Sequence, residues 1–101
     1  MVVVRDIFRL KFGQSKEAVA LWKEAAASLR TSGYGAVDVR LLTDLVGAPF
    51  YTVVLESTFN SVAEWETAHL AARDNAPWKA LYGKIVAFTE TGHREILSVI
   101  A

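Results

Sequence analysis

Trp65 and His69 stand four residues apart in the stretch AEWETAHLAARDNAPWKAL, residues 63–81. A spacing of four places two side chains on one face of a helix. Because an imidazole changes charge near neutral pH, His69 is a candidate proton acceptor in catalysis. The structural interpretation is that Trp65 belongs to the apolar stripe of an ordinary helix and that His69 is a half-buried histidine with one hydrogen-bond partner.

A second group of candidates consists of charged residues inside apolar strands. The sheet face that packs on helices accommodates few charges, so we expect these side chains to share the opposite face. They are Arg5, Arg9, Asp38, Arg40, Glu56 and one of Arg94 or Glu95. Acidic and basic residues are equal in number, 11 each, which favours ion pairs such as Arg40 with Glu56. The functional alternative is an anion or carboxylate site that uses Arg5, Arg9 or Arg40.

Metal and cofactor chemistry have little support in the sequence. The chain has no cysteine, and its two histidines, His69 and His93, form no metal-binding motif. We therefore expect no metal site and no cofactor, with His69 as an axial haem ligand the one alternative left open. No glycine-rich phosphate loop, nucleophile elbow or pair of catalytic carboxylates is recognisable.

The overall charge excludes other classes of function. A net charge of zero gives no bulk attraction for nucleic acid or for an anionic membrane. No apolar run reaches the length of a membrane span, and the first ten residues do not have the pattern of a signal peptide. We expect a cytoplasmic protein without nucleic-acid or membrane partners.

Apolar periodicity and capping residues predict the elements that would position these side chains. Ser15 is the expected N-cap of the first helix, Gly33 its left-handed end, and Ser61 with Glu64 a capping box. The segment KIVAFT, residues 84–89, fits either a helix or a strand, and we favour helix. The predicted order is a strand over Val2–Phe12, a helix over Ser15–Gly33, strands over 34–45 and 50–59, a helix from Ser61 broken before Pro77, a second helical piece stopped by Gly92, and a strand over His93–Ile100.

This order is that of the split βαβ, or ferredoxin-like, fold. It predicts one α+β domain over residues 1–101, with a four-stranded antiparallel sheet and its helices on one face. Apolar residues make up 52% of the chain, more than a domain of this size easily buries alone. We therefore expect a homodimer that forms through the open face of the sheet.

The chain resembles the dimeric α/β-barrel superfamily and, within it, the NIPSNAP-like family. The resemblance rests on the element order and on three segments, VVLESTFNSVAEWETAH, APWKALYGKI and GHREILSVI. It implies that two copies pack their open sheet faces together into a barrel. It also implies a pocket in each subunit, between the sheet and the helices, for a small apolar or aromatic ligand.

The resemblance extends to cofactor-independent monooxygenases of the same superfamily, which use Asn, Trp and His or Arg around a pocket. By that likeness Asn60 would hydrogen-bond a substrate oxygen, Trp65 would form a wall and His69 would accept a proton. The leading expectation is a ligand-binding protein of the NIPSNAP-like type. The alternatives are a monooxygenase or small isomerase that uses His69, and a purely structural association module.

Overall fold

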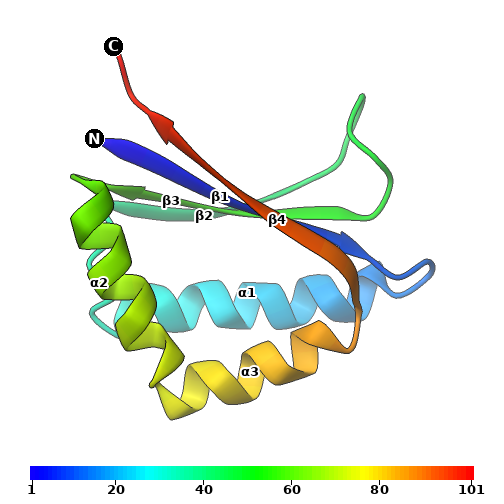
Figure 1. Ribbon diagram of the computed structural model, residues 1–101. Helices are drawn as coiled ribbons and strands as arrows, with labels where there is room; N and C mark the ends of the chain where they lie inside the picture. The colour runs from blue at the N-terminus through cyan, green and yellow to red at the C-terminus, as the bar shows by residue number, and fades with distance from the viewer.

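The computed structural model describes residues 1–101 as a sheet layer with a helix layer on one side (Figure 1). The four strands lie in the order β2-β3-β1-β4, and every neighbouring pair is antiparallel. The predicted ferredoxin-like architecture is confirmed, with the second helix of the motif divided in two. The elements are β1 Val2–Leu10, α1 Ser15–Thr31, β2 Asp38–Thr43, β3 Thr52–Phe59, α2 Val62–Arg73, α3 Ala76–Val86 and β4 Thr89–Ser98.

The main core lies between α1 and the sheet. Trp22 and Leu29 are buried on the face of α1 that the apolar stripe predicted. They meet the inward side chains of the strands, and the Phe8 ring lies 5.0 Å from the Trp22 ring. The indole N–H of Trp22 is buried without a hydrogen-bond partner. Gly33, with φ of 73°, follows α1 in the left-handed conformation, as expected.

Several predicted ends of elements were wrong. The strands predicted over Val2–Phe12 and 34–45 are shorter, Val2–Leu10 and Asp38–Thr43, and two further errors concern the helices. Ser15 is the first residue of α1 and not its cap, because the N-cap position belongs to Gln14, which makes no side-chain capping bond. The final helix ends at Val86 and not at Gly92, so residues 89–92 start β4. The sheet explains the second error: strand β4 pairs with β1 from Thr89 onward, and that ladder of hydrogen bonds outweighs the helical pattern.

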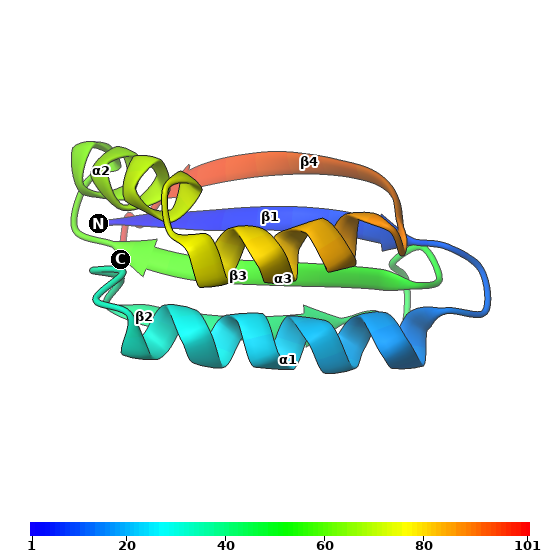
Figure 2. The same cartoon turned by 90° about the horizontal axis from the view of Figure 1, so that it is seen from below.

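Side-chain caps begin both α2 and α3. The Ser61 hydroxyl accepts the backbone N–H of Glu64 at 3.1 Å, as the capping box predicted. The Asn75 side chain accepts the backbone N–H of Trp78 at 2.9 Å, with Pro77 in the first turn of α3. The chain changes direction at Asp74 and Asn75, between the two helices, so α2 lies near one end of the sheet while α3 runs beside α1 (Figure 2).

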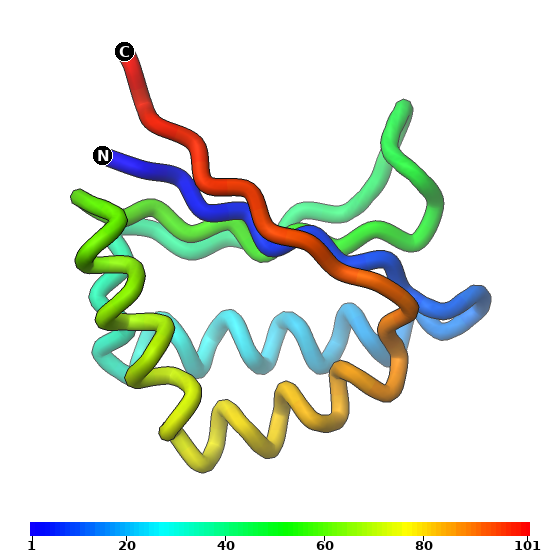
Figure 3. Tube along the Cα trace, in the orientation of Figure 1, coloured from blue at the N-terminus to red at the C-terminus, as the bar shows by residue number.

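The other face of the sheet carries no helix (Figure 1). The strand register places Arg5, Arg40 and Glu56 side by side on it, and the predicted ion pair forms, with Arg40 Nε 2.7 Å from Glu56 Oε1. The β2–β3 loop, residues 44–51, and the C-terminal segment both rise from this face, at opposite ends of the sheet (Figure 3). None of the three helices is both long enough and apolar enough to cross a membrane.

Candidate functional site

The five residues singled out from the sequence do not converge on one place. Asn60, just beyond β3, is exposed and lines an open groove between α2 and the α1–β2 loop. Trp65 and His69 do not line that groove and lie toward Arg94 of β4. Arg9 and Arg40 belong to the opposite, helix-free face of the sheet, where Arg40 is paired with Glu56.

Trp65 and His69 form part of a cluster that the sequence did not reveal. Their rings stack at 5.1 Å between centroids, with an angle of 23° between the planes. The Arg94 guanidinium lies 5.0 Å from the Trp65 ring centroid, in the position of a cation–π contact. Arg94 Nε also donates to Asp6 Oδ1 at 2.5 Å. We call these four residues, Asp6, Trp65, His69 and Arg94, the Asp6 cluster.

The Asp6 cluster corrects the expectation that the helix-facing side of the sheet would carry no charge. Side chains alternate along a strand, so Asp6 shares its face with the buried Val4 and Leu10. Arg94 stands directly opposite Asp6 in the register. The pair is tolerated there because β4 is an edge strand that is almost wholly exposed, and the two charges neutralise each other.

The cluster sets the charge of His69. Burial lowers the pKa of the imidazole below its ordinary value, and the nearby positive charges of Arg94 and Arg73 lower it further. The Asp6 carboxylate opposes them by raising the pKa, but it does not overcome them. His69 is therefore a neutral imidazole at neutral pH, and its ring can accept a proton.

Tyr34 lies at the inner border of the cluster. Its ring meets Phe59 edge-on, with 5.4 Å between centroids. Burial raises the pKa of the phenol, and the Asp6 charge raises it further, against smaller lowering effects of the Ser57 hydroxyl and Arg94. The phenol therefore stays protonated and can serve as a hydrogen-bond donor near Asp6.

The Asp6 cluster opens into a groove between β4 and α3, which we call the β4 groove. Its volume is about 440 Å³. Phe8 and Tyr82 give it aromatic walls, and Asp6 and Arg94 give it charge. Gly92 also lines the groove. A Cβ at this position would come within 2.7 Å of the Phe8 ring.

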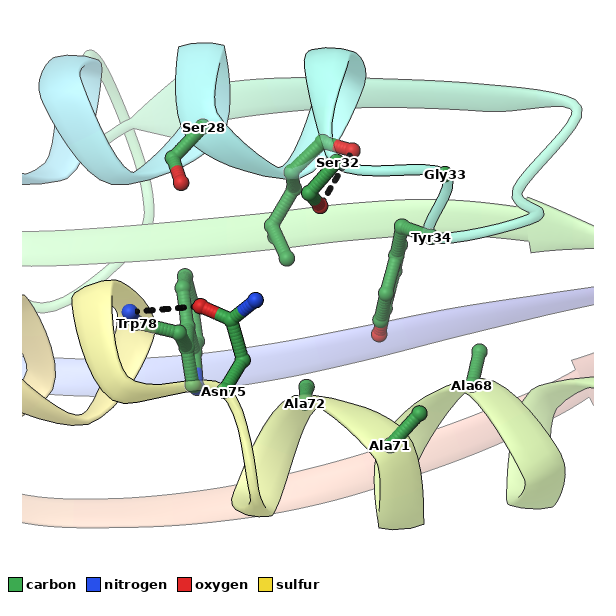
Figure 4. A pocket seen from close by; sticks show the side chains of 10 residues that line it. Ser28, Ser32, Gly33, Tyr34, Ala68, Ala71, Ala72, Asn75 and Trp78 are labelled. Atoms are coloured by element: carbon green, nitrogen blue, oxygen red, sulfur yellow. Dashed lines mark hydrogen bonds between the residues drawn. The ribbon is translucent and has the colours of Figure 1, made fainter.

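A second cavity lies among the three helices (Figure 4). It is much smaller, about 70 Å³, and the Tyr34 ring projects into it from the loop after α1 (Figure 4). Small side chains such as Ala68, Ala71 and Ala72 face it from α2. It adjoins the open groove that contains Asn60, with Tyr34 lining both. Its volume admits a few water molecules and no aromatic ligand.

No group of three or more histidine or acidic side chains comes together in a way that could hold a metal ion. His93 approaches only Glu95, with 3.8 Å between Nε2 and Oε1. In the strand register both residues belong to the helix-free face, although His93 also lines the β4 groove.

Comparison with known proteins gives the fold a wider context. No protein-family model and no curated protein sequence matches the chain. Among solved structures, an uncharacterized NIPSNAP domain protein from Burkholderia xenovorans superposes with a TM-score of 0.85 at 18% identity, over 100% of this chain and 96% of that one. A NIPSNAP family protein from Agrobacterium tumefaciens gives 0.82 at 18% identity, over 95% and 82%.

The chain shares its ferredoxin-like fold with these NIPSNAP structures. A putative antibiotic biosynthesis monooxygenase from Nitrosomonas europaea also shares it, with a TM-score of 0.76 at 12% identity over the full length of both chains. The NIPSNAP structures superpose better than the monooxygenase structures. The resemblance inferred from the sequence is thereby confirmed at the level of fold, since identities this low carry no ligand or reaction from one protein to another.

Two residues of the site were missed, although the sequence holds a signal for one of them. Asp6 interrupts the inward series of Val4, Phe8 and Leu10, and a charge at such a position calls for a partner. Arg94 was left undecided against Glu95 because alternation along the strand does not say which set of side chains faces the helices. The register that joins Asp6 to Arg94 is a long-range feature and cannot be read from local periodicity.

Proposed function

We propose that this protein is a NIPSNAP-like binding protein that takes a small aromatic ligand in the β4 groove, between sheet and helices. The observation that carries the proposal is an ion pair of Asp6 and Arg94 that opens into an aromatic-walled groove. Ligand sites combine mostly apolar walls with a few polar groups that fix orientation. Phe8 and Tyr82 are the walls here, and Arg94 is the polar group.

Arg94 has hydrogen-bonding capacity left for a ligand. Asp6 engages the Nε–H, and the guanidinium makes no other hydrogen bond to the protein. Its two NH₂ groups can therefore donate to a ligand oxygen. Because the Asp6 carboxylate sits beside them, a neutral acceptor such as a phenol or an aryl ketone suits the groove better than an anion.

A titration with 2-naphthol tests this proposal by NMR. We expect the backbone signals of residues around the β4 groove to shift, and an Arg94→Ala variant to weaken binding by about tenfold through the lost charge-assisted hydrogen bonds. An Arg73→Ala variant, which removes a positive charge from the exposed end of α2, is the matched control. Equal affinity for 2-naphthol in the two variants would show that Arg94 does not contribute to binding.

A second candidate is an enzyme, either a cofactor-independent monooxygenase or a small isomerase that uses His69. One observation favours it: the imidazole is neutral at neutral pH and lies in one cluster with the Arg94 cation. A base paired with a cation suits proton abstraction next to a carbonyl. Since His69 lines none of the grooves described above, binding without catalysis remains the leading proposal. A His69→Ala variant that keeps fold and 2-naphthol affinity would leave the enzymatic candidate without support.

The homodimer through the helix-free sheet face is part of the same proposal. Leu42 and Leu97 are exposed on this face, and Val3, Ile7 and Val54 are only partly covered. A surface of this kind is a candidate interface. Sedimentation velocity tests it: we expect a dimer at micromolar concentration, and a stable monomer there would contradict the proposed assembly.

A further inference from the structure

A groove at one end of the molecule is lined by aromatic side chains from two loops. The β1–α1 turn and the β2–β3 loop lie at this same end of the sheet (Figures 1 and 3). Phe12 comes from the turn, and Phe50 and Tyr51 come from the loop. The groove has a volume of about 530 Å³, and we call it the aromatic groove. Leu10 and Val19 line it from the side of the sheet that faces the helices, so it is separate from the β4 groove and from the helix-free face.

The rings of the aromatic groove are exposed, and two of them form a corner. Phe12 is 83% exposed and Phe50 is 77% exposed. Phe12 meets Tyr51 edge-on, with 5.3 Å between the ring centroids and 74° between the planes. Large aromatic side chains that gather on a surface indicate a binding site rather than a core. The faces of such rings carry partial negative charge and attract cations.

Tyr51 is held in a conformation that few residues adopt. Its φ is 64°, the only positive φ in the chain outside glycine. Its carbonyl accepts the backbone N–H of Leu10 at 2.7 Å, and the Thr52 hydroxyl donates to the Pro49 carbonyl at 2.7 Å. Left-handed backbone is unfavourable for a residue with a Cβ and is kept where the surroundings fix it, as at ligand sites. The loop therefore presents Tyr51 to the groove from a fixed backbone.

Asp44 gives the aromatic groove its charge. It is the only charged residue of the lining, it is half-buried, and it forms no ion pair. Its Oδ1 accepts the backbone N–H of Thr52 at 2.9 Å, which orients the carboxylate, whereas Oδ2 makes no hydrogen bond to the protein. Helix α1 begins beside the groove at Ser15, but the partial positive charge of a helix start is only about half an elementary charge. The groove therefore favours a cation.

We propose that the aromatic groove binds a small quaternary ammonium compound. A trimethylammonium group spreads its charge over methyl groups that pack on ring faces, and it has no N–H that would need an acceptor. Asp44 adds attraction from a half-buried position, where water screens a charge less than in bulk solvent. The volume of the groove lies in the range that small-molecule sites occupy, so we assign the site to a free compound rather than to the same group on a lipid. The proposal is independent of the ligand proposed for the β4 groove.

An NMR titration with choline chloride tests the proposal. We expect the backbone signals of Phe12, Phe50 and Tyr51 to shift. The neutral alcohol in which a tert-butyl group replaces the trimethylammonium group has the same shape, and we expect it to bind at least about fivefold more weakly. Equal affinity for the two compounds, or shifts confined to the β4 groove, would overturn the proposal. Binding to phosphatidylcholine vesicles without binding to free choline would also overturn it.

Substitutions locate the cation within the groove. Asp44→Asn removes the charge but keeps an oxygen for the Thr52 N–H, so the loop should stay in place while choline binds at least about fivefold more weakly. Asp38→Asn removes the same charge from an exposed carboxylate outside the groove and is the matched control. Phe12→Leu removes an exposed ring and should also weaken binding without loss of the fold. Equal affinity for choline in the Asp44 and Asp38 variants would contradict the assignment.

Discussion

The Arg94 guanidinium donates its Nε–H to Oδ1 of Asp6 at 2.5 Å, on the side of the sheet that faces the helices. The two residues are 88 positions apart in the chain and are brought together only by the pairing of β1 with β4. Their charges act on His69 in opposite directions, Arg94 lowering and Asp6 raising its pKa.

Replacing Arg94 by Gln should raise the pKa of His69, because the imidazolium no longer meets a positive charge. Replacing Asp6 by Asn should lower the pKa of His69 below its wild-type value, because the one negative charge that favours the imidazolium is lost. The pH titration of the His69 imidazole signals by NMR measures both shifts. Shifts of the same sign in the two variants would contradict the proposed electrostatic coupling.

The lowered pKa of His69 also affects stability. The unfolded chain takes up a proton at the ordinary histidine value of 6.5, whereas the folded chain does so only at lower pH. Stability is therefore fully present above 6.5 and falls as pH drops from there through the folded pKa. Urea unfolding at a series of pH values should show a shallower decline in His69→Gln. A decline in His69→Gln as steep as in the wild type would contradict this contribution.

Glu56 gives a dependence of the same sign at lower pH. Burial acts to raise its pKa, but the hydrogen bonds and charges of Arg40 and Arg5 outweigh burial and leave the pKa below its ordinary value of 4.5. Its contribution is present above 4.5 and is lost as pH falls through the folded pKa. Glu56→Gln should cost about 1–2 kcal/mol at pH 7, a modest figure because both arginines are partly exposed, and should flatten the acid limb of the stability curve.

Urea denaturation of Glu56→Gln beside Glu90→Gln measures this difference. Glu90 is exposed and makes no ion pair, so its replacement should leave the free energy of unfolding within about 0.5 kcal/mol of wild type. A Glu56 variant that behaves like the Glu90 variant would show that the ion pairs of Glu56 with Arg5 and Arg40 do not stabilise the fold.

Gly92 tests the wall of the β4 groove. An alanine Cβ would come within 2.7 Å of Phe8 Cδ1, so Gly92→Ala must displace the ring that packs on Trp22. We expect a loss of about 1–3 kcal/mol and weaker binding of 2-naphthol. Gly83→Ala is the control: nothing lies within 4 Å of its Cβ, and a helical Gly-to-Ala change should stabilise by about 0.5–1 kcal/mol. Unchanged affinity in Gly92→Ala would place the ligand elsewhere.

Local patterns were sufficient to predict most of the architecture. The apolar stripe with Trp22 and Leu29 predicted α1, and the cap at Ser61 predicted α2, because both depend on contacts within a few residues. The alternation of charged and apolar residues was sufficient to pair Arg40 with Glu56. The start of β4 was wrong because residues 84–89 fit two periods, and only pairing with β1 decides between them.

The candidate site was less predictable than the fold. Trp65 and His69 were found from their spacing, and their ring stacking agrees with it. Asp6 and Arg94 depend on strand register, which sequence periodicity does not fix. The β4 groove depends further on where α3 ends relative to the sheet edge. Asn60, Arg9 and Arg40 are residue types that are common in binding sites, but they lie outside the Asp6 cluster and the β4 groove. Their role in ligand binding stays a prediction without geometric support.

The location of a bound aromatic probe tests the central proposal most directly. Intermolecular NOEs between 2-naphthol and the protein would show which rings it contacts. We predict NOEs to Phe8 and Tyr82, with chemical-shift changes at Arg94. NOEs confined to the helix-free face, to the cavity around Tyr34, or to no single place would contradict the assignment of the β4 groove as the ligand site.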